Sequence, residues 1–168
     1  VYFNYRQLLS TGYRHDNCQF YMPGFWYRRN LRSPKKAPSF HTSDSWLVRE
    51  DRLSAPLTGI FSEKEKRFMT VNRLDDFSMD ALATHKEGEI ILSGKTSLGF
   101  TGFENQQGIA MLSFGFPYRE APKSYIRKLT LAPEVEAFQL MKKGESVLLT
   151  WEIMESGADD FSDFIQHT

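Results

Sequence analysis

Short apolar runs bounded by turn-forming residues recur about every ten residues along this chain. They include 57–61, 68–74, 109–116 and 147–153, and in the last of these apolar side chains alternate between the two faces of a strand. Runs of this length and spacing are typical of antiparallel sheets packed as a sandwich or barrel. We therefore predict an all-β fold, an antiparallel β-sandwich of about 8–10 strands.

Turn residues between these runs predict how the strands are joined. A charged turn at 62–66 predicts a hairpin between 57–61 and 68–74. Gly94-Lys95 predicts a tight hairpin between 89–93 and 96–100, and the segment 142–145 predicts another between 135–141 and 147–153. The most apolar run, 109–116, is expected to be a central strand. Residues 75–87 are expected to form a loop with one helical turn at most.

Length and composition argue against several classes of protein for this chain. The 168 residues favour one domain, 1–168. The 14 Phe, 7 Tyr and 3 Trp argue against disorder. Equal numbers of basic and acidic residues, 21 of each, argue against a nucleic-acid partner. No apolar run reaches the ~18 residues of a membrane span, and the first residues do not resemble a signal peptide. A single cysteine, Cys18, allows no disulfide within the chain and no cysteine-rich zinc site.

The last residues predict a short amphipathic helix. Phe161, Phe164 and Ile165 are spaced to share one helical face, and Asp159 and Asp160 would lie at its N-terminal end. No glycine or proline follows to end the helix. We interpret 156–168 as the start of a linker helix whose apolar face meets a further domain. The alternative is a terminal helix that docks on this chain's own sheet.

The segment from Phe20 to His41 is the most informative for function, because it combines four turn-breaking residues with many aromatic and basic ones. Aromatic faces and arginine or asparagine donors there can contact a saccharide. The same residue types can bind single-stranded nucleic acid, although the zero net charge argues against it. The third interpretation is a loop buried against a neighbouring domain. The candidates for ligand or interface contact are Trp26, Tyr27, Arg28, Arg29, Asn30, Arg32, His41 and Trp46, and Trp46 is equally interpretable as a core residue.

Catalytic patterns are weak. His15, His41, His85 and His167 lack the spacing of metal ligands, so no metal or cofactor is predicted. Neighbouring acids at Glu50-Asp51 and Asp75-Asp76 have the residue type of glycosidase carboxylates, but adjacent strand residues diverge to opposite faces. Ser43-Asp44-Ser45 lacks the glycine turn of a nucleophilic serine. Cys18 has no basic neighbour and is expected to be an unreactive thiol.

Three parts of the chain resemble a known family. Phe138-Gln-Leu-Met-Lys-Lys-Gly-Glu-Ser-Val-Leu-Leu-Thr-Trp-Glu-Ile153 with the helix after it resembles the end of the N-terminal sandwich domain of multidomain glycoside hydrolases. In these proteins a supersandwich similar to galactose mutarotase precedes an (α/α)6 catalytic barrel. Gly24-Phe-Trp-Tyr-Arg-Arg-Asn30 resembles their cleft-facing loops, and 49–54 with 58–61 resembles their early strands.

The resemblance implies a non-catalytic sandwich domain that packs on a catalytic barrel of the same parent chain and shapes its glycan cleft. No catalytic residue carries over, because the catalytic acids of such proteins lie in the barrel. The resemblance also implies a periplasmic or secreted parent. Two alternatives remain open, namely a free-standing carbohydrate-binding module and a small mutarotase-like or lyase enzyme. The enzyme would need His41 to converge with Glu50 or Asp51 in one cleft.

Overall fold

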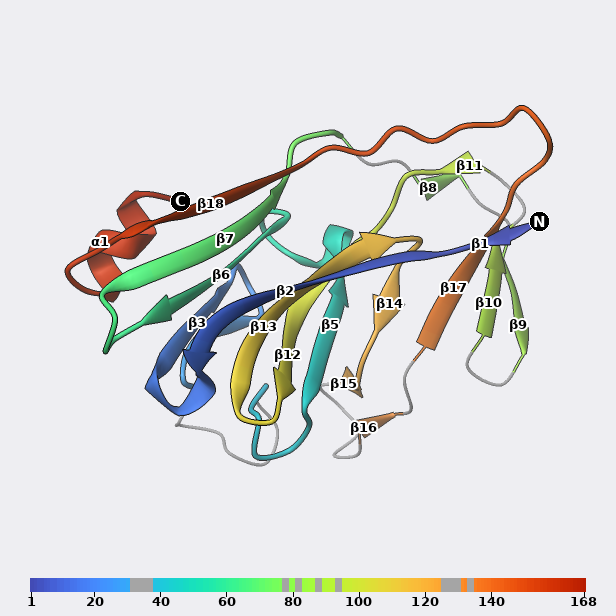
Figure 1. The fold of residues 1–168 in the computed structure, drawn as a ribbon. Coiled ribbons are helices and arrows are strands. Elements are labelled where there is room, and N and C mark those ends of the chain that lie inside the picture. Colours follow the sequence, from blue (N-terminus) through green and yellow to red (C-terminus); the bar gives the residue numbers. More distant parts are fainter. Residues whose placement is uncertain are drawn as a thin grey trace.

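The computed structural model describes residues 1–30, 38–76, 79–80, 83–86, 89–92, 95–124, 131–132 and 135–168. Figure 1 shows a molecule built almost wholly of strands, with one short helix at the C-terminal end. In chain order the elements are β1 (Tyr2–Phe3), β2 (Tyr5–Arg14), η1 (His15–Asn17), β3 (Cys18–Met22), β4 (Trp26–Arg28), β5 (Ser45–Arg49), η2 (Glu50–Arg52), β6 (Leu57–Ser62), β7 (Arg67–Arg73), β8 (Met79–Asp80), β9 (Ala83–Lys86), β10 (Glu89–Leu92), β11 (Lys95–Thr96), β12 (Phe100–Gln106), β13 (Ile109–Phe116), β14 (Arg119–Glu120), β15 (Lys123–Ser124), β16 (Leu131–Ala132), β17 (Val135–Leu140), β18 (Trp151–Gly157) and α1 (Phe161–Gln166).

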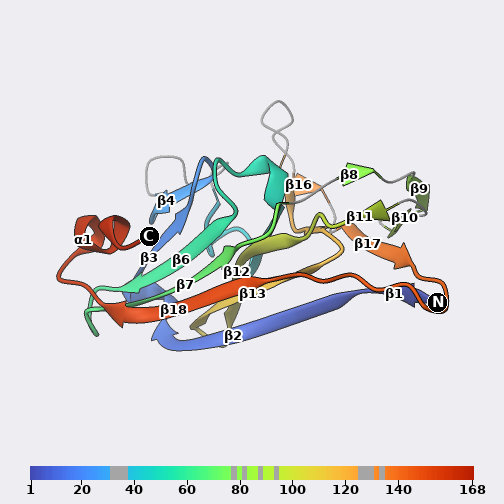
Figure 2. The same ribbon diagram turned by 90° about the horizontal axis from the view of Figure 1, so that it is seen from above.

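Two antiparallel sheets face each other and form the sandwich. One has the strand order β2-β13-β12-β5, and the other has the order β18-β7-β6-β3-β4. Their facing side chains make one apolar core in which Trp46, Phe103 and Leu112 of the first sheet meet Phe20 and Ile60 of the second. Figure 2 shows the two layers from above. The predicted all-β sandwich is therefore confirmed.

The first sheet is buried on its other face as well. In β5, Trp46 and Val48 belong to the core of the sandwich, whereas Leu47 points to a second core with Phe100 and Leu92. This second core lies against a further sheet, in which β17 is flanked by β1 and β10, β9 follows β10, and β14 also pairs with β17. The β10–β17 pair is parallel, unlike the other strand pairs of this sheet. Burial on both faces explains why β13 reads as a nearly continuous apolar run.

Several predicted elements are confirmed. Strands β6 and β7 pair across the charged turn from Leu57↔Asn72 to Ser62↔Arg67. Strand β13 lies between β2 and β12 and is buried over nearly its whole length, as expected of a central strand. The helix α1 forms at the predicted place, with Asp160 as its N-cap. No helix within the described ranges is long and apolar enough to cross a membrane.

Two predicted hairpins are wrong. Strand β10 pairs with β9 and β17, whereas β12 pairs with β13 and β5, so the arms proposed around Gly94-Lys95 enter different sheets. Likewise β17 and β18 lie in different sheets, although the turn at 142–145 exists, with Glu145 N donating to the carbonyl of Lys142 at 3.1 Å. The chain continues extended from this turn along one side of the molecule to β18 (Figure 1). Local turn chemistry was correct there, but burial of the flanking strands chose other partners.

The segment 75–87 was expected to be a loop with one helical turn, and this expectation is wrong. Strand β8 pairs with β11, and β9 pairs with β10. Within this segment, Phe77 and Leu82 lie outside the described residues. Short strands of this kind are specified by their neighbours more than by their own sequence.

Candidate functional site

A recess of about 220 Å³ opens where three segments of the chain meet at one end of the sandwich. These segments are η1 with the start of β3, the end of the β3–β4 hairpin, and the turn before β5. The recess is lined by His15, Asp16, Cys18, Phe20, Trp26, Arg29, Asn30, Ser39, Phe40 and His41.

The β3–β4 hairpin carries the recess residues of the second segment. Its turn contains Pro23 and Gly24, and Gly24 has a φ of 82°, which glycine adopts without strain. Beyond β4 the chain bends sharply, because Arg28 (φ 56°) and Asn30 (φ 51°) both have left-handed backbone conformations. Such residues are uncommon outside functional or tightly constrained sites. The side-chain amide of Asn30 donates to the Pro38 carbonyl at 3.2 Å and so ties this bend to the third segment.

An aromatic cluster forms the wall of the recess. The ring centroid of Phe40 lies 5.2 Å from that of Phe20 and 5.4 Å from that of Trp26. The His15 ring makes a T-shaped contact with the same ring, with 5.5 Å between the centroids. Phe20 and Trp26 are buried, whereas Phe40 and His15 are only partly buried. Phe40 and His15 are therefore the rings of this cluster with surface left for a ligand.

Polar groups surround this wall. Arg29 forms an ion pair with Glu63 at 2.6 Å (Nη2 to Oε2). Asp16 is held by Arg14 at 3.2 Å, and this hydrogen bond lowers the pKa of the Asp16 carboxyl. His41 is exposed at the rim, and its backbone N–H donates to Ser39 Oγ at 3.1 Å. The arrangement offers hydrogen-bond donors and acceptors beside a partly exposed aromatic ring, which suits the binding of a polar ligand.

The structure brings together only some of the candidates from the sequence. Trp26, Arg29, Asn30 and His41 all line the recess, but Trp26 is buried in the core and cannot serve as an open stacking face. Trp46 is fully buried, and its indole donates to the carbonyls of Ser39 and Ser43 at 3.0 and 3.1 Å. The core interpretation of Trp46 is therefore correct. Arg32 lies outside the described residues.

Tyr27 and Arg28 point away from the recess toward α1. The ring of Tyr27 lies 5.2 Å from that of Phe161, and the Arg28 guanidinium lies 5.3 Å from the same ring. Phe161 and Phe164 are buried against Phe61 and Phe68 of this chain's own sheet, and Ile165 is partly buried beside them. The two phenylalanines are thus not available as a docking face for another domain. Their position agrees with the alternative interpretation, in which the terminal helix docks on this chain's own sheet.

Two further recess residues, His15 and Asp16, were not linked to the site by the sequence. They lie about 25 residues before His41, and only the pairing of β3 with β4 and β6 brings them to the same end of the sheet. A polar pair directly before a buried strand was the available signal, but such a pair is common at strand ends. Register between distant strands is not encoded locally.

Cys18 lines the recess but is buried, and burial raises the pKa of its thiol to about 12. We predict that iodoacetamide modifies the folded protein at pH 8 roughly a thousandfold more slowly than the unfolded chain, because the thiolate is the reactive form. Mass spectrometry over a time course in buffer and in urea measures both rates. Rapid modification in buffer would contradict the packing described for β3.

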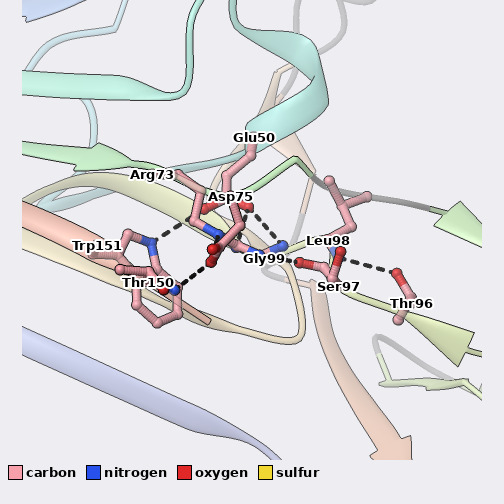
Figure 3. A network of polar contacts seen from close by, with 9 residues as sticks. All are labelled: Glu50, Arg73, Asp75, Thr96, Ser97, Leu98, Gly99, Thr150 and Trp151. Carbon is pink, nitrogen blue, oxygen red and sulfur yellow. Dashed lines mark hydrogen bonds and ion pairs between the residues drawn. The ribbon is translucent and has the colours of Figure 1, made fainter. Parts of the chain in front are cut away.

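The acids at Glu50 and Asp75 belong to a second polar cluster, shown in Figure 3. Glu50 is fully buried, and its carboxylate accepts hydrogen bonds from Arg73 Nη1 at 3.0 Å, Gly99 N at 2.8 Å and the Trp151 indole at 3.3 Å. Arg73 also donates to Asp75 at 3.3 Å and to the Ser97 carbonyl at 3.0 Å. Glu50 is therefore a buried partner of Arg73 and not a solvated acid.

This second cluster holds elements together and offers no open site. It joins η2 to the last residue of β7, the first residue of β18 and Gly99, the residue before β12. The side chains of Glu50 and Arg73 are both inaccessible to solvent. Glu50 is absent from the lining of the recess, and Asp51 is bound by Arg49 at 2.6 Å. The convergence of His41 with Glu50 or Asp51 that an enzyme would need is therefore not found in the recess.

Among the described residues, no three His, Cys, Asp or Glu side chains are grouped so that they could hold a metal ion. Comparison with known proteins gives no relative: no family model, no curated protein and no solved structure matches the chain. The resemblance to glycoside hydrolase sandwich domains therefore stays a prediction from the sequence. What the structure establishes is an all-β sandwich in which a small recess, lined by aromatic and polar residues, lies beside a tightly bent segment that carries Arg29 and Asn30.

Proposed function

We propose that this chain is a non-catalytic glycan-binding β-sandwich domain and that the recess is its sugar-contacting site. The observation that carries the proposal is the combination of the partly exposed Phe40 ring with the side chains of Arg29, Asn30 and His41 around one small cavity. An apolar ring face with a few converging polar groups is the general form of a small-molecule site.

The size of the recess fits one sugar unit better than a large ligand. Its volume of about 220 Å³ lies below the range of roughly 300–1,000 Å³ for drug-sized ligands. A terminal or protruding sugar ring of a glycan chain would enter, while the rest of the chain would stay outside. Such a site binds weakly on its own, as expected of a module that works by avidity or beside a catalytic domain.

The lining residues favour binding over catalysis. Glycoside hydrolysis generally needs two carboxyl groups on either side of the scissile bond. Asp16 is the one carboxylate among the lining residues, and it is engaged by Arg14. A larger carbohydrate-active parent, its catalytic barrel and its periplasmic or secreted setting stay predictions from the sequence.

The test is a glycan-array screen of the folded domain, followed by calorimetry on the strongest ligand. We expect saturable binding that His41→Ala weakens by about tenfold, since His41 is an exposed rim residue whose loss leaves the core intact. Tyr27→Ala is the matched control, because Tyr27 is exposed but lies outside the recess, and its affinity should stay within about twofold of the wild type.

Two outcomes would contradict the proposal. If the folded wild-type domain binds no glycan on the array, the glycan-binding function is wrong. If Tyr27→Ala removes binding and His41→Ala does not, the sugar site lies on the surface near α1 and not in the recess. Trp26→Ala is unsuitable for this test, because its buried ring supports the core.

A further inference from the structure

We propose that the recess recognises a carboxylate, so that the glycan it binds carries acidic sugar units. This inference rests on the proposed function and adds the chemical class of the ligand. It depends on the state of Arg29, on the other charges that face the recess, and on how rigidly the segment around Arg29 is held.

Arg29 is only partly satisfied within the protein. Its guanidinium has five N–H donors, and its ion pair with Glu63 uses Nη2. Its Nε is buried and has no acceptor among the described residues. A buried donor without a partner costs free energy, so this guanidinium is incompletely satisfied by the described part of the chain. A carboxylate is the acceptor whose two oxygens match a guanidinium edge.

The other charges that face the recess favour an anion over a cation. His15 and His41 add no negative charge to the recess, and both offer ring N–H donors. Asp16 is the opposing charge, and Arg14 neutralises it at 3.2 Å. Glu63 competes for Arg29, but it is not among the residues that line the recess, whereas Arg29 is.

The backbone around Arg29 is arranged for binding. The left-handed residues Arg28 and Asn30 flank Arg29 directly, and Asn30 is fixed to Pro38 on the far side of the recess. Arg29 is thereby held at the junction of two segments, so little ordering is needed when a ligand arrives. Strained, tied backbone next to a partly satisfied arginine is the pattern of a ligand clamp.

The experiment compares one acidic glycan with its own neutral form. The strongest carboxylated ligand from the array is titrated by calorimetry both as the free acid and after methyl esterification, which keeps the sugar and removes the charge. We expect the free acid to bind at least about tenfold tighter than the ester. Arg29→Gln should remove this preference, whereas Arg67→Gln, which alters an exposed arginine outside the recess, should preserve it.

The outcomes separate this inference from the proposed function. Equal affinity for acid and ester, or an array that is bound only by neutral glycans, overturns the carboxylate inference and leaves glycan binding standing. An Arg29→Gln protein that melts like the wild type but keeps the full preference also overturns it. Absence of any glycan binding overturns the proposed function itself. Loss of the preference in Arg29→Gln, with Arg67→Gln unchanged, supports the clamp.

Discussion

Arg73→Met is expected to lower the free energy of unfolding by about 3–5 kcal/mol, because it leaves the buried Glu50 carboxylate without its charged partner. Methionine fills a similar volume but donates no hydrogen bond. Trp151 and Gly99 still donate to Glu50, yet neither supplies a positive charge. Urea unfolding followed by tryptophan fluorescence measures the change.

The matched control is the double variant Glu50→Gln, Arg73→Met. It removes both charges of the pair, and we expect it to be more stable than Arg73→Met alone, since the two sites are in direct contact and their effects do not add. If Arg73→Met loses less than about 1 kcal/mol, the pair is not buried in solution as described.

The same variant gives a pH prediction. Burial raises the pKa of Glu50 above its ordinary 4.5, and the attraction of Arg73 opposes that rise. Without Arg73 the pKa rises further. A raised folded-state pKa contributes stability that is present below the unfolded value and is lost as pH rises through the folded value. The deficit of Arg73→Met relative to wild type should therefore be smaller at pH 5 than at pH 8. A deficit that grows toward pH 5 would contradict this assignment.

Phe164→Ala is expected to cost about 3–5 kcal/mol as well, although the residue lies only four positions before the last. Its ring is fully buried, lies 5.0 Å from Phe68, and stacks on Phe61 at 6.1 Å. It also covers Gly59, where a side-chain carbon would lie 2.5 Å from the ring. Alanine would leave a cavity that α1 and the sheet cannot close.

Ile165→Ala is the matched control on the same helix, because Ile165 is only partly buried and its loss should cost clearly less. Thermal and urea unfolding of both variants give the comparison. If Phe164→Ala is as stable as the wild type, α1 is detached in solution and is free to act as a linker.

The recess was predicted from the sequence only in part. The aromatic and basic character of 20–41 pointed to a site, and Arg29, Asn30 and His41 do converge there. The roles of individual aromatics were not readable, because a tryptophan at a ligand and a tryptophan in a core have the same local sequence. Burial alone separates Trp26 and Trp46 from the exposed Tyr27.

Local sequence determined the elements whose signals are short-range. The alternation of apolar residues, the turn between β6 and β7, and the spacing and N-cap of α1 all act within a few residues. Tertiary structure decided which strands pair, as β10, β17 and β18 show, and which charges meet, as Glu50 and Arg73 show from 23 residues apart. The physical reason is that register and ion pairing depend on burial of both partners, which exists only once distant strands have packed together.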